Sequence, residues 1–127
     1  MSEVQQSFRD ALGRHLLAIH EKNLKALADT LADEKLILIM SDGRLVQTTR
    51  QFLELHKGWF AMDNWNLDVK PVDVLETADL GVAVLRLDYR EAGADRTTTR
   101  QESLLTLVFQ KRGGKWVMVL DQNTPVK

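Results

Sequence analysis

Apolar residues recur every three or four positions over residues 4–20, which is the spacing of one face of a helix. That face carries Val4, Phe8, Ala11, Leu12, His15 and Ile19, and Ser2 is a suitable N-cap before it. A second, shorter helix is predicted behind a cap at Asn23, with apolar positions at Leu24, Leu27, Ala28 and Leu31. A third is predicted to begin with the capping-box pair Thr48 and Gln51 and to bury Phe52, Leu55, His56 and Trp59.

Strand patterns dominate the rest of the chain. Residues 35–40 form a short apolar run before a turn, which predicts a buried strand. From Trp65 onward apolar and polar residues alternate, and Pro71 predicts a bulge or bend in this strand. Further strands are predicted at 81–91, 97–110 and 116–123, with a tight turn at residues 113–114. Three helices with one short strand among them therefore precede an antiparallel meander, which predicts an α+β fold with the helices packed on one face of the sheet.

Composition and charge narrow the class of protein. The 127 residues predict a single domain over 1–127, and lysines plus arginines (17) nearly balance aspartates plus glutamates (18), so no nucleic-acid partner is expected. There is no cysteine, which excludes disulfides and thiolate metal sites. No apolar run has the length of a membrane span, and the polar first residues lack the pattern of a secretory leader. We therefore expect a cytoplasmic protein with no membrane partner.

Two stretches resemble a known superfamily. They are AIHEKNLKALADTLADE at residues 18–34 and LLTLVFQKRGGKWVMVLDQNTPV at residues 104–126. Both are similar to the nuclear transport factor 2-like superfamily, and more closely to its SnoaL-like and domain-of-unknown-function-4440 branch. The resemblance implies a cone in which a curved, mostly antiparallel sheet wraps three N-terminal helices around a pocket. It also implies a homodimer that pairs through the outer face of the sheet.

The resemblance places His15 where the ketosteroid isomerases of the superfamily carry a tyrosine that donates to the substrate oxygen. Their catalytic aspartate would fall at about Ile39, and their acidic oxyanion donor near Thr106 or Leu107. Because isoleucine cannot accept a proton, the steroid-type proton shuttle is not expected in this chain.

A different set of polar residues remains as a candidate site. Alternation places Val117, Val119, Asp121 and Asn123 on one face of the last strand, and the resemblance turns that face toward the pocket. Asp121 would then approach His15, and a carboxylate beside an imidazole raises its pKa and suits a general base. We therefore take His15 and Asp121 as candidate catalytic residues. The candidate ligand-binding residues are His15, His56, Trp59, Trp65, Tyr89 and Asp121.

Each of these residues also has a purely structural interpretation. His15 can be a satisfied core histidine, and His56 can be a packing residue beside Trp59. The pair Arg86 and Asp88 is expected outside the pocket, because the apolar face of its strand is the alternate one. A metal site built from His15, His56 and Asp121 is not expected, since these residues come from distant segments, and no cofactor motif is found.

Three functions therefore remain open. The first is a protein that binds a small, largely hydrophobic molecule in the conical pocket. The second is an enzyme of isomerase, dehydratase or cyclase type that transfers a proton through His15 and Asp121. The third is a non-catalytic domain that assembles into an oligomer, as the kinase association domains of the superfamily do.

Overall fold

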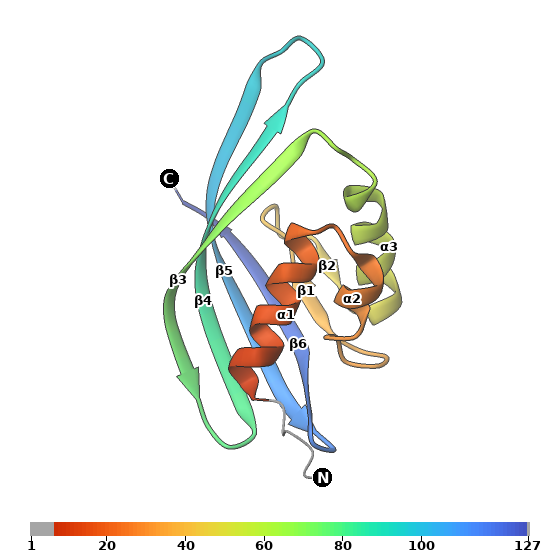
Figure 1. Cartoon of the computed structure of the whole chain (residues 1–127), viewed down its shortest axis with the longest axis vertical. Coiled ribbons are helices and arrows are strands. Elements are labelled where there is room, and N and C mark those ends of the chain that lie inside the picture. The colour runs from red at the N-terminus through yellow and green to blue at the C-terminus, as the bar shows by residue number, and fades with distance from the viewer. Residues whose placement is uncertain (1–6, 127) are drawn as a thin grey trace.

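The computed structural model describes residues 7–126, which form three helices and a six-stranded sheet. Figure 1 shows that the helices lie on one side of the sheet. The elements in chain order are α1 (Phe8–His20), α2 (Leu24–Ala28), β1 (Ile37–Ile39), β2 (Leu45–Val46), α3 (Thr49–Phe60), β3 (Trp65–Glu76), β4 (Leu80–Ala92), β5 (Thr98–Arg112) and β6 (Lys115–Pro125). The strands lie in the order β2-β1-β6-β5-β4-β3. The pair β1–β6 is parallel and the other four pairs of the sheet are antiparallel.

The predicted α+β fold is confirmed, and the short strand predicted among the helices is β1. The three N-terminal helices that the resemblance implies are only roughly observed, because β1 and β2 precede α3 along the chain. The short strand β2, which pairs with β1, was not predicted: two residues are too few to show a period. Together, β1 and β2 extend the meander into a mixed sheet.

The starts of the three helices follow the capping rules. Ser7, Asn23 and Thr48 each accept a hydrogen bond from the backbone N–H three residues further on, at 3.0–3.1 Å. The predicted caps at Asn23 and Thr48 are confirmed. The reciprocal half of the capping box is displaced, since Gln51 Oε1 accepts from the backbone of Gln47 rather than of Thr48. The expected cap Ser2 and the apolar position Val4 lie outside the described residues, and Ser7 caps α1.

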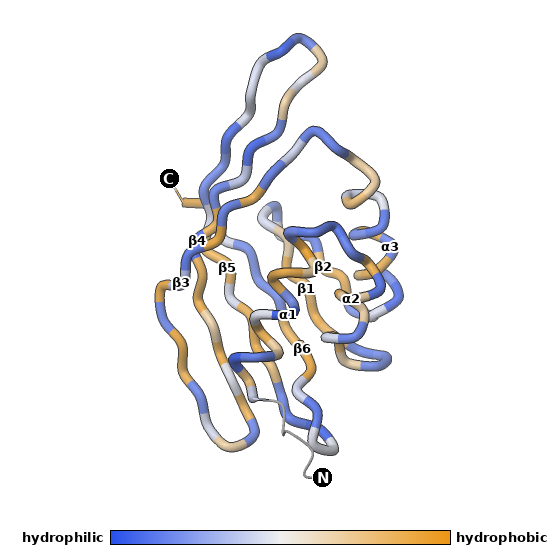
Figure 2. Tube along the Cα trace, in the orientation of Figure 1, coloured by the Kyte–Doolittle hydropathy of each residue, from blue (hydrophilic) through white to orange (hydrophobic). Residues whose placement is uncertain are grey.

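The core lies between the helices and the inner face of the sheet. Figure 2 shows hydrophobic residues concentrated along the middle of the strands and interspersed with hydrophilic residues in the helices that cover them. Phe8 anchors the N-terminal end of α1, and its ring centroid lies 5.6 Å from those of both Phe109 and Trp116. The same ring lies on Gly81, where a Cβ atom would come within 2.5 Å of it. A residue without a side chain is therefore required at the start of β4.

Two bulges set which side chains face the helices. The pairing of β3 with β4 shifts between Pro71 and Asp73, as the proline predicts. A second shift lies in the pairing of β5 with β6, where Phe109 is opposite Met118 but Leu107 is opposite Asp121. Val119 is the extra residue of this bulge.

The second bulge corrects one prediction. Strict alternation would put Val117 and Val119 on the face of Asp121 and Asn123. The bulge instead places Met118 and Asp121 on the same, inner face, and Val117 lies opposite Gln110 on the other face. Both Met118 and Asp121 are buried as a result.

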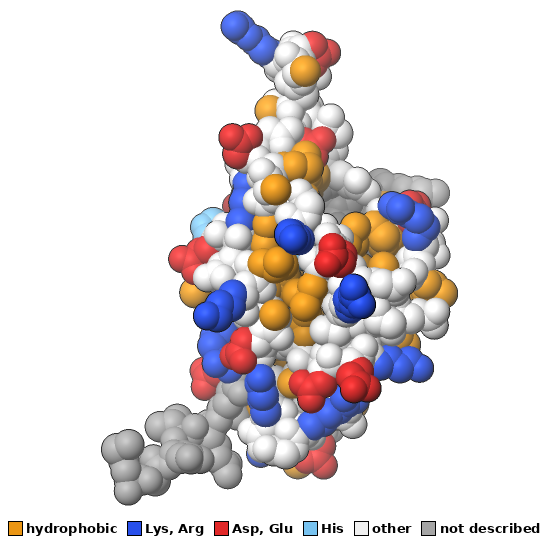
Figure 3. Space-filling view, turned by 90° about the vertical axis from the view of Figure 1, so that its right-hand side faces the viewer, with side chains coloured by type: hydrophobic (Ala, Val, Ile, Leu, Met, Phe, Trp, Pro, Cys, Tyr) orange, Lys and Arg blue, Asp and Glu red, His pale blue; other side chains and the backbone are white. Residues whose placement is uncertain are grey.

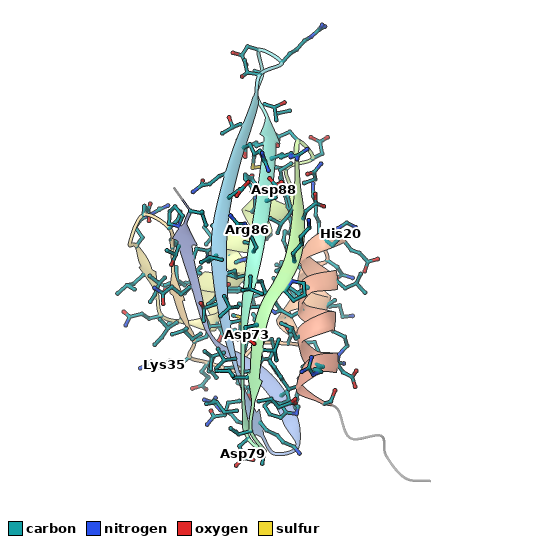
Figure 4. All side chains as sticks on the ribbon, turned by 90° about the vertical axis from the view of Figure 1, so that its left-hand side faces the viewer. His20, Lys35, Asp73, Asp79, Arg86 and Asp88 are labelled. Carbon is teal, nitrogen blue, oxygen red and sulfur yellow. The ribbon has the colours of Figure 1, made fainter. Side chains whose placement is uncertain are left out.

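No helix formed by residues 7–126 covers the outer face of the sheet, and Figure 4 shows this face with Arg86 and Asp88 labelled. Arg86 pairs with Glu102 at 3.0 Å, and Arg100 bridges Asp88 and Glu102, each at 2.9 Å. Arg86 and Asp88 therefore lie outside the pocket, as the alternation of β4 predicts. No helix within residues 7–126 has the length and apolar character needed to cross a membrane.

Candidate functional site

A cavity of about 400 Å³, called here the inner chamber, lies between the inner face of the sheet, the end of α1 and α3. Its apolar lining is Ile19, Leu38, Met40, Leu55, Leu67, Leu87 and Leu105. Its polar lining is Ser41, His56, Tyr89, Asp121 and Asn123, with Trp59 beside them. A smaller hollow of about 150 Å³ extends it past Tyr89 toward Gln101 and Ser103.

The fold brings these residues together from distant parts of the sequence. The parallel pairing of β1 with β6 places Leu38 opposite Asp121. Helix α3 packs its Phe52 face on the core, which directs His56 and Trp59 toward the same space. Figure 3 shows hydrophobic side chains gathered on the face where α2 and α3 lie. Leu55 of the chamber lining is 38% exposed and contributes to this apolar surface.

Asp121 is the buried carboxyl group of the chamber. Its side chain accepts a hydrogen bond from Asn123 Nδ2 at 3.2 Å. Removal from water raises the pKa of Asp121 to about 7, because desolvation penalises the charged form. The carboxyl group is therefore protonated in a substantial part of the molecules near neutral pH, and can then donate a hydrogen bond into the chamber as well as accept one.

His56 presents a hydrogen-bond acceptor to the chamber. Its Nδ1 lies 2.8 Å from the carbonyl oxygen of Phe52, which can only accept, so Nδ1 carries the proton. Burial lowers the pKa of His56, an effect that outweighs the opposing influence of this hydrogen bond. The neutral ring stacks on Phe52 with centroids 4.0 Å apart, and its Nε2 keeps a free lone pair.

Trp59 and Tyr89 form an aromatic wall. Trp59 Nε1 donates to the Tyr89 hydroxyl at 3.4 Å, and that hydroxyl donates to Glu91 at 2.7 Å. Trp65 lies behind this wall, stacked on Trp59 at 4.0 Å and 12°, and its Nε1 donates to the carbonyl oxygen of Trp59 at 2.9 Å. Lys22 covers Trp65, with Nζ 4.2 Å from the ring centroid. Trp65 therefore supports the wall rather than lining the chamber.

His15 lies on the buried face of α1 and is not part of the lining of the inner chamber. Its Nδ1 is 2.8 Å from Thr30 Oγ1, and its ring meets the Phe109 ring edge-on at 5.7 Å. Burial, and then repulsion from His56, lower the pKa of His15 to about 3, so the ring is neutral at neutral pH. The expected approach to Asp121 is not observed, since no hydrogen bond or ion pair joins these two described residues.

The structure thus brings together four of the six predicted site residues, namely His56, Trp59, Tyr89 and Asp121. The other two, His15 and Trp65, lie behind the lining. The roles predicted for all six stay predictions. Sequence reasoning did not select Leu38 and Met40, because a fully apolar run gives no period that tells the chamber side from the other side. Within residues 7–126 no group of three or more His, Asp or Glu side chains is placed to hold a metal ion.

Comparison with known proteins identifies the family. The family model described as a SnoaL-like domain matches residues 9–122. The comparison with curated proteins finds no match.

Solved structures share the fold at low sequence identity. A putative calcium/calmodulin-dependent protein kinase type II association domain from Thiobacillus denitrificans is 20% identical, with a TM-score of 0.81, covering 99% of this chain and 100% of that chain. A ketosteroid isomerase-like protein from Erwinia carotovora is 14% identical, with a TM-score of 0.79 and coverage of 100% and 99%. A putative dehydratase from Streptomyces avermitilis is 13% identical, with a TM-score of 0.75 and coverage of 91% of each chain. The chain belongs to the SnoaL-like family and shares its fold with nuclear transport factor 2-like proteins.

Proposed function

We propose that this protein binds a small, uncharged, largely hydrophobic molecule in the inner chamber. The observation that carries the proposal is that Asp121, Asn123 and His56 line one cavity whose lining is largely apolar. Ligand sites typically combine an apolar lining with a few polar groups that fix orientation. A ligand with one carbonyl or hydroxyl group on an apolar body fits this arrangement.

The charge of the lining favours a neutral ligand. No lysine or arginine is among the described residues that line the chamber, so an anion would enter without a partner. A cation would need ionised Asp121, and burial opposes that form of the carboxyl group. Protonated Asp121 and the free Nε2 of His56 instead offer a donor and an acceptor to a neutral ligand.

Proton transfer is the second candidate function, and the position of Asp121 favours it. A carboxyl group with a pKa near neutrality can both give and take a proton, and such groups are typical of catalytic sites. The reaction would be an isomerisation, dehydration or cyclisation of a hydrophobic carbonyl compound. His56 shares the chamber with Asp121, whereas no hydrogen bond or ion pair joins Asp121 to His15, the partner predicted for it. Two of the similar structures are described as a putative dehydratase and a ketosteroid isomerase-like protein.

Assembly is a further property that we propose, in the form of a homodimer through the outer face of the sheet. Outward positions of β4 and β5 carry Val82, Val84, Leu104, Thr106 and Val108, which are only half-buried in the single chain. Apolar surface of this kind on a sheet without covering helices is suited to pairing. A non-catalytic role in assembly is the third candidate function, and one of the similar structures is described as a putative kinase association domain.

Titration with Nile red, an uncharged dye whose emission rises in apolar surroundings, tests the binding proposal. We expect saturable binding to the wild type and loss of at least tenfold in affinity in Met40→Trp, because Met40 lines the chamber and the larger side chain would occupy part of its volume. Leu45→Trp is the matched control, because Leu45 is exposed on the neighbouring strand β2. Equal binding by all three proteins would contradict the proposal.

A separate experiment tests proton transfer. An enzyme of the proposed type should exchange the hydrogens beside the carbonyl group of a bound methyl ketone for deuterium in heavy water. Wild type should accelerate this exchange, followed by NMR, and Asp121→Asn should remove the acceleration while retaining Nile red binding. Binding without accelerated exchange would leave the chamber as a binding site and reject the catalytic candidate.

A further inference from the structure

A second apolar hollow, called here the outer groove, lies between α1 and β3 and has a volume of about 580 Å³. Helix α1 lines it with Leu12, Gly13, Leu16 and Leu17, and β3 with Val69, Pro71 and Val74. Arg9, His20 and Asp68 also line it, and all three are exposed. The groove therefore offers an apolar floor with charged groups at its solvent side.

The outer groove adjoins the inner chamber. Ile19, Leu67, Leu87 and Leu105 line both cavities, so their side chains stand between them as a partition. The partition contains no polar side chain, and its members are aliphatic groups that move between staggered rotamers. A hydrocarbon chain can pass such a partition without leaving a polar group unsatisfied.

We propose that the inner chamber and the outer groove form one site for an uncharged amphiphile with a straight hydrocarbon chain. The polar head lies among Asp121, Asn123 and His56, and the tail passes the partition into the outer groove. This inference rests on the function proposed above and specifies its ligand class.

The distribution of polar groups sets the orientation. Buried hydrogen-bonding groups occur in the inner chamber, where a head group without partners would be costly. The charged groups of the outer groove are already hydrated, because they are exposed to solvent, and Arg9 forms an ion pair with Glu76 at 3.7 Å. The tail is therefore favoured in the groove, where it covers Leu17, which is 53% exposed in the free protein.

Two glycines provide a matched pair of variants. A side chain added at Gly13 meets nothing within 4 Å and projects from α1, beside the outer groove that Gly13 lines. A side chain added at Gly58 of α3 also meets nothing within 4 Å, and Gly58 lines neither cavity. Both positions are exposed in a helix, so Gly13→Phe and Gly58→Phe should fold equally well.

The test measures displacement of Nile red by methyl ketones of increasing length, from hexanone to tetradecanone. In wild type and Gly58→Phe, affinity should rise by about fourfold for each added methylene that becomes buried. In Gly13→Phe, short ketones should bind as in wild type, but the affinity should stop rising at a shorter ketone than in wild type. Decanoate and decylamine should bind at least tenfold more weakly than the ketone of equal length.

Other results would overturn specific parts. If the affinity stops rising at the same ketone length in Gly13→Phe and in wild type, the outer groove is not part of the site. If decanoate or decylamine binds as tightly as the ketone, the head is not an uncharged group. In both cases loss of hexanone binding in Met40→Trp would still support the inner chamber. Hexanone binding that is unchanged in Met40→Trp would reject the proposed function itself.

Discussion

His15 donates the proton on its Nδ1 to Thr30 Oγ1, at 2.8 Å. The direction follows from the next contact, because the Thr30 hydroxyl uses its own proton to donate to the carbonyl oxygen of Leu27 at 2.7 Å. The ring is neutral, and its Nε2 is buried with no hydrogen-bond partner within the described residues. Thr30 therefore sets the tautomer of a histidine that holds α1 against the segment after α2.

Replacing Thr30 by valine should lower the free energy of unfolding by about 1–3 kcal/mol, because the buried Nδ1–H of His15 loses its acceptor. Urea unfolding at neutral pH measures the change. Thr99→Val, an exposed strand position, is the control and should stay within about 0.5 kcal/mol of wild type. Equal values for the two variants would show that the hydrogen bond contributes nothing.

Asp121→Asn should gain stability over wild type as the pH rises. Above the ordinary pKa of 3.8 the unfolded chain ionises Asp121, whereas the native protein keeps the carboxyl group protonated up to about pH 7. Each pH unit in this window costs wild type about 1.4 kcal/mol, and asparagine does not titrate. The free energy of unfolding of Asp121→Asn minus that of wild type should therefore increase with pH. Relative to its value at pH 4, this difference should reach about 4 kcal/mol near pH 7 and then level off.

Urea unfolding of both proteins between about pH 4 and pH 8 measures this difference. Asp79→Asn is the control, since Asp79 is exposed in the turn between β3 and β4. A difference between wild type and Asp121→Asn that does not change with pH would contradict the raised pKa of Asp121.

Gly81→Ala should destabilise the protein by about 1–3 kcal/mol, because the added methyl group would overlap the buried Phe8 ring. Gly58→Ala should instead be neutral or stabilise by up to about 1 kcal/mol, as alanine favours the helix and meets nothing within 4 Å. Thermal unfolding compares the two variants. A destabilised Gly58→Ala, or an unchanged Gly81→Ala, would be inconsistent with the packing described.

Leu104→Glu should convert the proposed dimer into a monomer. Leu104 lies on the outer face of β5, opposite Arg86 of β4, where a charge would be buried in the interface between two copies. Sedimentation velocity measures the mass. Thr98→Glu, at the exposed end of β5, should remain dimeric. A wild type that sediments as a monomer would reject the interface.

Sequence patterns predicted the fold well because most elements carry strong local signals. The helix caps at Asn23 and Thr48 and the bulge at Pro71 each depend on a few neighbouring residues. The strand β2 and the bulge at Val119 lack such signals. A bulge reverses the side-chain alternation after it, so a prediction for one end of β6 fails at the other.

The candidate site was predicted less completely for a related reason. Alternation placed Tyr89 on the apolar face of its strand, and the resemblance turned the face that carries Asp121 toward the pocket. Helical spacing placed His56 and Trp59 on one side of α3. Helical spacing also put His15 on a buried face, but it does not tell a core position from a chamber lining. That distinction depends on Thr30, a residue from another segment, whose hydroxyl oxygen accepts the hydrogen bond from the N–H group of the ring.

The measurement that tests the central claim most directly is the NMR signal of the three tryptophan indoles during titration with decanone. Trp59 lines the inner chamber, Trp65 is stacked behind it, and Trp116 lies in the core against Phe8. We expect the Trp59 signal to shift most and saturably, Trp65 less, and Trp116 hardly at all. Equal small shifts of all three, or a shift confined to Trp116, would contradict binding in the inner chamber.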